Sequence, residues 1–430
     1  MGKSLITRVT LFAGLPLAAC LGLVALAAHA QGRDPGGPRL TFGITQRFES
    51  TENLDLDVNS AGRTNQATTG LSFGLLSETQ TTSFGLDAGG ILRAVDQAGG
   101  GSDVSFDDKR LGLRYSHSGA NTTLTFGANL REARIEFLRP LEDFIDENGV
   151  IVLPDDLDQF NGTGKRQNYT LNAGLDWGKG GPWGFGVNAR YNQLTYTNTS
   201  SPSLFDSNRW TVGGNLRFAI DPATEARFSL SQSRFRDDDP TSDTRDTLHF
   251  GLDLTRDRPS GAINTSFSAD DTEDGTRLNL TFGHDFTLPT GALSVNLGIS
   301  RSADGDISPS GNLAWQQSLP NGAINARLQS SVISGTDDTD RLVTSLSLGV
   351  SRELSALSSL NLNLAWADSE STSGGDSTTN ASVGATYTHM LTEDWGMDLG
   401  YNHRLRDTSA GTANSDTVFL ALRRTFDLRP

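Results

Sequence analysis

The stretch Gly70–Gly74 reads GLSFG and matches the G-x-S-x-G pattern, in which a serine acts as the nucleophile of a hydrolase. That chemistry needs the serine on a sharp turn between a strand and a helix. Here Ser72 lies inside a segment of alternating apolar and polar residues, and no helical pattern follows it. The pattern therefore indicates a strand residue rather than a catalytic one.

Five histidines beyond the N-terminal segment are the other candidates for acid–base chemistry, and none has a partner at a spacing typical of a catalytic pair. His284 and His389 share the apolar face of their segments, whereas His249 is on a polar face. The single cysteine, Cys20, excludes a disulfide framework and a cysteine metal site. We expect no catalytic residue, no cofactor and no metal site, and hence a protein that is not an enzyme.

Carboxylates gather between the alternating segments. The richest stretch, Arg139 to Arg166, contains Glu142, Asp143, Asp146, Glu147, Asp155, Asp156 and Asp158. Shorter runs begin at Asp237, Asp270 and Asp337, and none has the spacing of an EF-hand loop. These runs indicate solvated acidic loops; weak Ca²⁺ binding, or Ca²⁺ bridges to lipopolysaccharide phosphates, is the alternative.

Arginines dominate the polar faces of the same segments. In phase with those faces are Arg47, Arg93, Arg110, Arg114, Arg131, Arg190, Arg217, Arg227, Arg277, Arg327, Arg404 and Arg423. The acids in the same phase are Glu49, Asp87, Asp176, Asp253, Asp285 and Asp398. Guanidinium groups stay charged and bind carboxylates or phosphates, and charges of one sign set the selectivity of a pore. The arginines therefore predict either an anion-selective lumen or, as the alternative, ion pairs that fill space.

Strands must position these arginines. In the stretch from Leu342 to Ser369, LVTSLSLGVSRELSALSSLNLNLAWADS, apolar residues alternate with Ser, Thr, Gly and Asn, as in a strand whose two faces meet different surroundings. About 20 such segments follow one another from Arg39 to Phe426, and many are near the ~9–11 residues of a tilted membrane-spanning strand. A soluble sandwich is the alternative, but only 36% of the residues are hydrophobic, which suits a barrel with a wet interior.

The connections alternate in length. Short ones include KGGP at Lys179 and LPTG at Leu288, and longer ones include Ser50–Gln66, Arg139–Arg166 and Arg406–Asp416. Strict alternation predicts a barrel with one rim of tight turns, on the periplasmic side, and one rim of long loops. No segment of the chain has the pattern of a plug domain.

Tryptophans support a membrane barrel, because such barrels carry aromatic girdles at both ends of the lipid-facing surface. All six lie near a strand end and in phase with the apolar face: Trp177, Trp183, Trp210, Trp315, Trp366 and Trp395. Edge N–H and C=O groups have no partner in hydrocarbon, so a membrane-spanning sheet must close. About 20 strands should then enclose a wide aqueous lumen.

The N-terminus predicts export. Lys3 and Arg8 precede an apolar run that ends in Ala28-His29-Ala30, which is typical of a signal peptide cleaved before Gln31. A membrane anchor is one alternative. Lipidation at Cys20 is another, because LAAC is similar to a lipoprotein processing box.

On these features the chain resembles a porin-like outer-membrane β-barrel of Gram-negative bacteria. The last segment resembles the C-terminal signal read by the barrel-assembly machinery, with Val418, Leu420 and Leu422 alternating toward Phe426. Arg424 and the DLRP end depart from that signal. The resemblance implies location in the outer membrane, and it implies outer-membrane lipid, lipopolysaccharide and the assembly machinery as partners.

We therefore expect an all-β protein: a closed antiparallel up-and-down transmembrane β-barrel of about 20 strands (18–22), with short periplasmic turns and long acidic extracellular loops. The expected domains are a signal peptide (1–30), a polar linker (31–38), the barrel (39–426) and a tail (427–430). A net charge of -16 argues against nucleic acid as a partner.

The expected function is a passive, water-filled pore or substrate channel for a small hydrophilic solute, with a weak preference for anions. An export or assembly barrel that works with a periplasmic apparatus, for example in polysaccharide secretion, is one alternative. A closed structural or surface barrel is the other.

Overall fold

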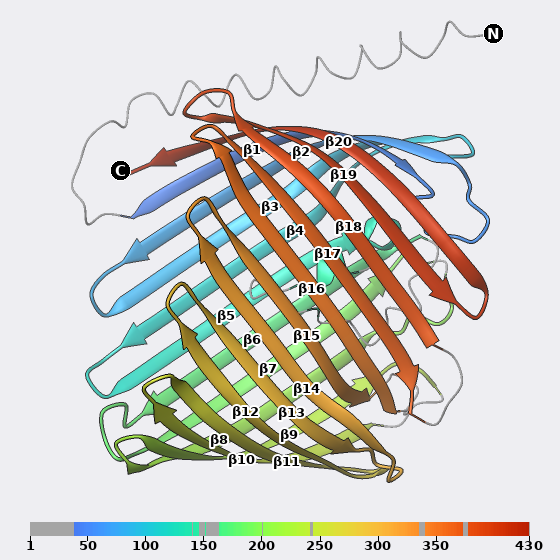
Figure 1. The fold of residues 1–430 in the computed structure, drawn as a ribbon. Coiled ribbons are helices and arrows are strands. Elements are labelled where there is room, and N and C mark those ends of the chain that lie inside the picture. Colours follow the sequence, from blue (N-terminus) through green and yellow to red (C-terminus); the bar gives the residue numbers. More distant parts are fainter. Residues whose placement is uncertain are drawn as a thin grey trace, which may run out of the picture.

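The computed structural model describes residues 38–139, 141–145, 151, 163–199, 201–240, 244–334, 340–372 and 377–429. Within these residues, 20 strands form one sheet, which the pairing of β1 with β20 closes. Each strand runs antiparallel to its neighbours in sequence, so the chain winds up and down around a barrel (Figure 1). The predicted fold class is confirmed.

The strands follow the predicted alternating segments one by one. They are β1 (Arg39–Glu52), β2 (Arg63–Glu78), β3 (Thr82–Asp96), β4 (Ser102–Ser118), β5 (Thr122–Arg134), β6 (Lys165–Trp177), β7 (Trp183–Thr197), β8 (Ser207–Asp221), β9 (Thr224–Asp237), β10 (Arg245–Arg258), β11 (Gly261–Thr272), β12 (Gly275–Leu288), β13 (Gly291–Arg301), β14 (Ile307–Leu319), β15 (Gly322–Ser334), β16 (Asp340–Ser355), β17 (Ser358–Ser371), β18 (Ser377–Met390), β19 (Trp395–Thr408) and β20 (Gly411–Leu428). Two short 3-10 helices, η1 (Ile135–Phe137) and η2 (Glu142–Phe144), follow β5. No helix in the described ranges is long and apolar enough to cross a membrane.

The apolar faces of the strands point outward. Leu348 pairs with Leu364, and Leu364 pairs with Val383, so three neighbouring strands present one apolar surface. The most exposed large apolar side chains include Leu297 (70%) and Phe282 (62%), which also lie on this face. Burial of these side chains requires lipid, because they do not pack into a core within the barrel.

The two rims of the barrel differ. Leu40 pairs with Leu428, so both ends of the barrel lie at one rim, together with short turns such as residues 222–223, 289–290 and 320–321 (Figure 1). The other rim carries the longer connections, including residues 53–62, 135–164 and 198–206.

The alternation of short and long connections is not strict. Residues 273–274 and 409–410 make two-residue turns at the loop rim. The expectation of a long loop over Arg406–Asp416 is therefore wrong. Asp407 pairs with Thr412, whose hydroxyl donates to the Asp407 carboxylate (2.6 Å), and this contact extends both strands to the turn.

The barrel begins at Arg39, and β20 continues past Phe426 to Leu428, because Asp427 and Leu428 pair with β1. The predicted signal peptide (1–30) and the linker up to residue 37 lie outside the described residues.

Candidate permeation path

Glycines let polar side chains lie flat on the lumen wall. An added Cβ at Gly112 would lie 2.5 Å from Asp87 Oδ1, and one at Gly127 would lie 2.5 Å from Asn172 Oδ1. Both glycines sit directly opposite these residues on the neighbouring strand. Small residues therefore keep the polar side chains close to the wall, where they narrow the lumen little.

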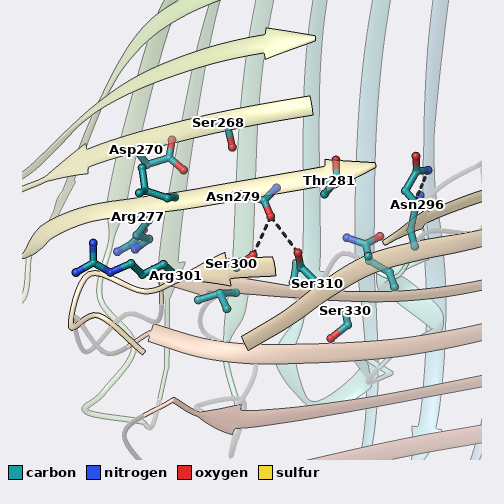
Figure 2. Close-up of a pocket in the computed structure, with 16 residues that line it drawn as sticks. Ser268, Asp270, Arg277, Asn279, Thr281, Asn296, Ser300, Arg301, Ser310 and Ser330 are labelled. Carbon is teal, nitrogen blue, oxygen red and sulfur yellow. Dashed lines mark hydrogen bonds between the residues drawn. The ribbon is translucent and has the colours of Figure 1, made fainter. Parts of the chain in front are cut away.

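One side of the lumen carries a hydrogen-bonding surface of amides and hydroxyls, with Asp270, Arg277 and Arg301 among the residues that line it. A hollow of about 360 Å³ lies over β11–β15 (Figure 2), where Asn279 Oδ1 accepts hydrogen bonds from Ser300 Oγ (2.9 Å) and Ser310 Oγ (3.0 Å). Asn296 donates to the Asn312 side chain (2.7 Å). The amides and hydroxyls of this wall can exchange hydrogen bonds with a hydrated solute.

The connection between β5 and β6 enters the lumen. Leu141 is fully buried, and it packs with Ile151 against Ala365 and Ala367, which point inward from β17. β17 is far from β5 around the barrel, so the connection reaches toward the opposite wall (Figure 1). Leu141 has a φ of 70°, a conformation that is rare for leucine and that its close packing sustains. We refer to the described residues 135–139, 141–145 and 151 as the inward segment. The non-periodic acidic stretch from Arg139 to Arg166 carries no sequence pattern that predicts this inward position.

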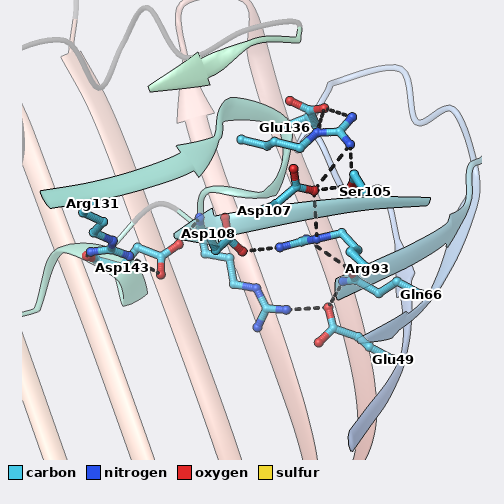
Figure 3. Close-up of polar contacts among 11 residues, drawn as sticks. Glu49, Gln66, Arg93, Ser105, Asp107, Asp108, Arg131, Glu136 and Asp143 are labelled. Atoms are coloured by element: carbon cyan, nitrogen blue, oxygen red, sulfur yellow. Dashed lines mark hydrogen bonds and ion pairs between the residues drawn. The ribbon is translucent and has the colours of Figure 1, made fainter. Parts of the chain in front are cut away.

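Ion pairs fix the inward segment to the wall near its start (Figure 3). Arg139 pairs with Glu49 of β1, which also pairs with Arg47 (2.5 Å). Arg131 of β5 reaches Asp143 (3.3 Å).

An aromatic contact joins the same network. The Phe137 ring lies 3.8 Å from the guanidinium carbon of Arg93 and 5.1 Å from that of Arg134. Arg93 pairs with Asp108, and Arg134 pairs with Glu136 (2.5 Å). The charges of this buried cluster are thus matched by opposite charges, which lowers the cost of burying them.

The covered and uncovered walls of the lumen differ. In the half nearer the loop rim, inward-facing residues are buried on β17, β18, β19, β20 and β1, among them Ala365, Ser382, Arg404, Thr417 and Glu49. The wall formed by β4–β9 keeps exposed inward-facing residues: Arg110, Arg114, Asn172, Asp176, Asn188, Arg190 and Arg227. The solvent-accessible path therefore runs along the arginine-bearing wall.

The structure places the predicted arginines in three groups. Eight form ion pairs with acids: Arg47, Arg93, Arg114, Arg131, Arg217, Arg227, Arg277 and Arg423. Arg404 is buried and donates to the Ser415 hydroxyl (2.9 Å) and the Leu54 carbonyl (3.2 Å). Among the described residues, Arg110, Arg190 and Arg327 have no ion-pair partner.

Several of the paired acids escaped sequence reasoning. The partners include Asp107, Asp108, Asp143, Glu225 and Asp340 as well as the predicted Glu49, Asp87 and Asp398. Strand ends, the bulge in β4 at Asp107 and Asp108, and the acidic connection supply the additional partners, and regular alternation inside a strand gives no signal for them. The excess of basic residues in the lumen is therefore smaller than the strand phases alone suggest.

The predicted girdle residues share the outer face. Trp177, Trp183, Trp315 and Trp395 lie toward the turn rim, and the Trp177 and Trp183 rings are 5.1 Å apart. Trp210 and Trp366 lie toward the loop rim.

Arg424, which interrupts the apolar face of β20, lies among aromatic side chains at the turn rim. Its guanidinium lies 4.4 Å from the Phe426 ring and 5.4 Å from the Trp395 ring, and it pairs with Asp394 (3.2 Å). Its charge thus reaches the membrane surface, while its stem covers apolar surface. Phe426 itself faces Phe42 of β1, with ring centroids 6.1 Å apart, at the seam that closes the barrel.

Comparison with known proteins identifies the fold. No known family matches the sequence, and no curated protein matches it. A mutant of the ferric enterobactin receptor PfeA from Pseudomonas aeruginosa is similar in structure, at 10% identity and a TM-score of 0.52, over 92% of this chain and 81% of that chain. A PfeA mutant in complex with enterobactin gives 11% identity and a TM-score of 0.51, over 92% and 82%. OpdQ from Pseudomonas aeruginosa matches over 91% and 99%, at 12% identity and a TM-score of 0.41. The chain has the fold of a Gram-negative outer-membrane β-barrel, and its apolar outer surface places it in the outer membrane.

Proposed function

We propose that the chain is a passive outer-membrane channel for small hydrophilic solutes, with a weak preference for anions. The observation that carries the proposal is the one-sided cover of the lumen. The inward segment occupies the wall near β17 and β1, while the wall that carries Arg110, Arg114 and Arg190 stays exposed.

Electrostatics favours anions on this path. Arg110 and Arg190 have no ion-pair partner among the described residues, and Arg114 is 79% exposed, with only a 3.3 Å contact to Asp87. The exposed arginines outnumber the exposed Asp176 on this wall, and an excess of charge of one sign along an aqueous path concentrates counter-ions. The effect weakens as salt shortens the Debye length. Because the loop rim is acidic, the expected preference is weak and is strongest at low salt.

The same proposal includes the partners. The turn rim faces the periplasm, the barrel-assembly machinery reads β20 through Phe426, and lipid with lipopolysaccharide surrounds the barrel. Cleavage before Gln31 produces the mature chain. The protein does not catalyse a reaction, and its solute is small and hydrophilic.

A closed structural barrel is the second candidate, because the inward segment already occupies part of the lumen. Single-channel conductance of the full mature chain in a planar bilayer separates the two candidates. Open channels support the pore, whereas a barrel that is folded, as shown by its heat-modifiable mobility on gels, but never conducts supports the closed barrel.

Selectivity is tested in a salt gradient. Arg114→Glu combined with Arg327→Glu should shift the zero-current potential toward cations, because both side chains lie on inward-facing positions. Arg63→Glu, at the start of β2 on the loop rim, is the matched control and should shift the potential much less, because the charge of this exposed side chain is screened by solvent and salt. An open channel whose zero-current potential is unchanged by the two lumen substitutions would contradict the anion preference.

A further inference from the structure

Two of the four lysines in the chain meet on the outer surface of the barrel, although arginine supplies nearly all of its other cations. Lys109 is in phase with the outward-facing Leu111 of β4, and Lys165 is in phase with the outward-facing Tyr169 and Leu171 of β6. Both ammonium groups therefore lie outside the lumen and away from the permeation path.

One carboxylate organises the pair. Lys109 Nζ lies 3.1 Å from Glu132 Oε1, and Lys165 Nζ lies 3.5 Å from the same oxygen. Gln167 donates to the other carboxylate oxygen (2.8 Å). The Glu132 side chain is 8% exposed, whereas those of Lys109 and Lys165 are 44% and 32% exposed. The cluster therefore covers its negative charge, presents two ammonium groups within reach of one anion, and has a net positive charge.

The cluster lies at the membrane boundary on the loop side. At the start of β5, Thr122 pairs with Trp177 of the girdle at the turn rim. Glu132 follows near the other end of β5, about 25 Å higher for a strand tilted by roughly 40°, which equals the height of the apolar band. The phenol of Tyr169 contacts Gln167 (3.3 Å), as an aromatic residue at an interface would. The ammonium groups thus lie at the level of the outer-leaflet headgroups.

The neighbouring charges do not neutralise the lysines. The nearby acids Asp103 and Glu136 are already paired with Arg134 (2.8 Å and 2.5 Å). Below the cluster, toward the turn rim, the exposed side chains of Leu111 and Leu171 provide apolar surface. A cationic pair above an apolar surface fits an amphiphile whose headgroup is anionic.

We propose that Lys109 and Lys165 bind a phosphate group of an outer-leaflet lipid, with its acyl chains against the apolar surface below. Glu132 holds both ammonium groups in place until the phosphate approaches. The apolar surface beneath the cluster favours a lipid over a free phosphate ion.

Lipid binding tests the assignment. The purified full-length mature barrel in an uncharged detergent is titrated with bisphosphorylated lipid A, with dephosphorylated lipid A and with inorganic phosphate, and bound molecules are counted by native mass spectrometry. The Lys109→Gln/Lys165→Gln variant should bind phosphorylated lipid A on the order of tenfold more weakly, since each lysine near a lipid headgroup contributes about 1 kcal/mol. Lys179→Gln, which changes the lysine of a turn at the opposite rim, is the control and should bind like the parent protein.

Glu132→Gln should change the affinity for phosphorylated lipid A in the opposite direction. It removes the carboxylate that competes for the two ammonium groups and keeps the shape of the side chain. It should tighten binding of phosphorylated lipid A and leave binding of the dephosphorylated form unchanged. Equal binding by the parent protein and the double-lysine variant, or weaker binding by Glu132→Gln, would overturn the assignment. Inorganic phosphate that binds as tightly as the lipid would replace the lipid by a free anion and so would also overturn it.

Discussion

Arg139 of the inward segment forms an ion pair with Glu49 of β1, which lies 90 residues earlier in the chain. Glu49 is buried and also pairs with Arg47, so one carboxylate binds both the wall arginine and the segment. This contact, the pair of Arg131 with Asp143, and the packing of Leu141 on Ala365 and Ala367 hold the segment at separate places.

Release of this contact should widen the path. Arg139→Ala removes the pair with Glu49, while Arg47 still neutralises the buried carboxylate. Asn380, Ser382 and Asn402, in the described part of the wall, have buried side-chain oxygens without a hydrogen-bond partner, and water can reach them once the segment moves. We expect a larger single-channel conductance. Arg63→Ala at the loop rim is the control, and equal conductance of Arg139→Ala and the parent protein would show that this contact does not limit the path.

An arginine introduced at two adjacent residues of β17 should destabilise the barrel by very different amounts. Leu364 faces lipid, and Leu364→Arg should destabilise the folded barrel by roughly 2–4 kcal/mol, the cost of arginine near the bilayer midplane. Asn363 faces the lumen over Gly384, so Asn363→Arg should cost much less. Denaturant unfolding in vesicles measures both changes, and equal costs at the two positions would refute the assignment of the two faces.

A methyl group on a lumen glycine should narrow the path. In Gly127→Ala, the new Cβ would take the place of Asn172 Oδ1 and turn that amide into the lumen. Conductance should fall while stability changes by no more than about 1 kcal/mol, the span of strand propensities. Gly349→Ala on β16 is the matched control, because no atom lies within 4 Å of its added Cβ. An equal fall in conductance in both variants would show that Gly127 does not widen the path by letting Asn172 lie flat on the wall.

Acidification should stabilise the arrangement of the loop rim that the structure shows around Asp55. Burial raises the pKa of Asp55, in the connection between β1 and β2, and the negative charges of Asp57 and Glu136 raise it further, against the opposing charge of Arg404. A raised pKa means that ionised Asp55 opposes the folded arrangement above this pKa. The penalty disappears as the pH falls through it.

Glu136 belongs to η1, so protonation of Asp55 should hold the inward segment more firmly and lower the conductance. Asp55→Asn should have the lower conductance already at neutral pH and should lose this pH response. Glu353→Gln at the turn rim is the control. A conductance that rises on acidification in the parent protein, or a pH response that persists in Asp55→Asn, would exclude this role for Asp55.

Alternation in the sequence determined the strands and their faces, because the two-residue period of a strand is local and each residue shows which side it prefers. The segments from Arg39 to Phe426 therefore predicted the strands, the outward face of Leu364, the inward phase of Arg110 and the turn rim. Closure follows from the chemistry of lipid, which leaves no partner for an open sheet edge.

Only the tertiary structure placed the inward segment. Its residues show no periodic pattern of apolar and polar side chains. Its partners Glu49, Ala365 and Ala367 are distant in sequence, so their proximity depends on the curvature of the closed sheet. The tertiary structure also formed the cluster of Lys109, Lys165 and Glu132 on the outer surface. The two lysines come together because β4, β5 and β6 are neighbours in a specific register. The sequence by itself determined which face each strand residue takes. Closure of the barrel decided which charges meet, because strand order and register set the distances that electrostatic interactions depend on.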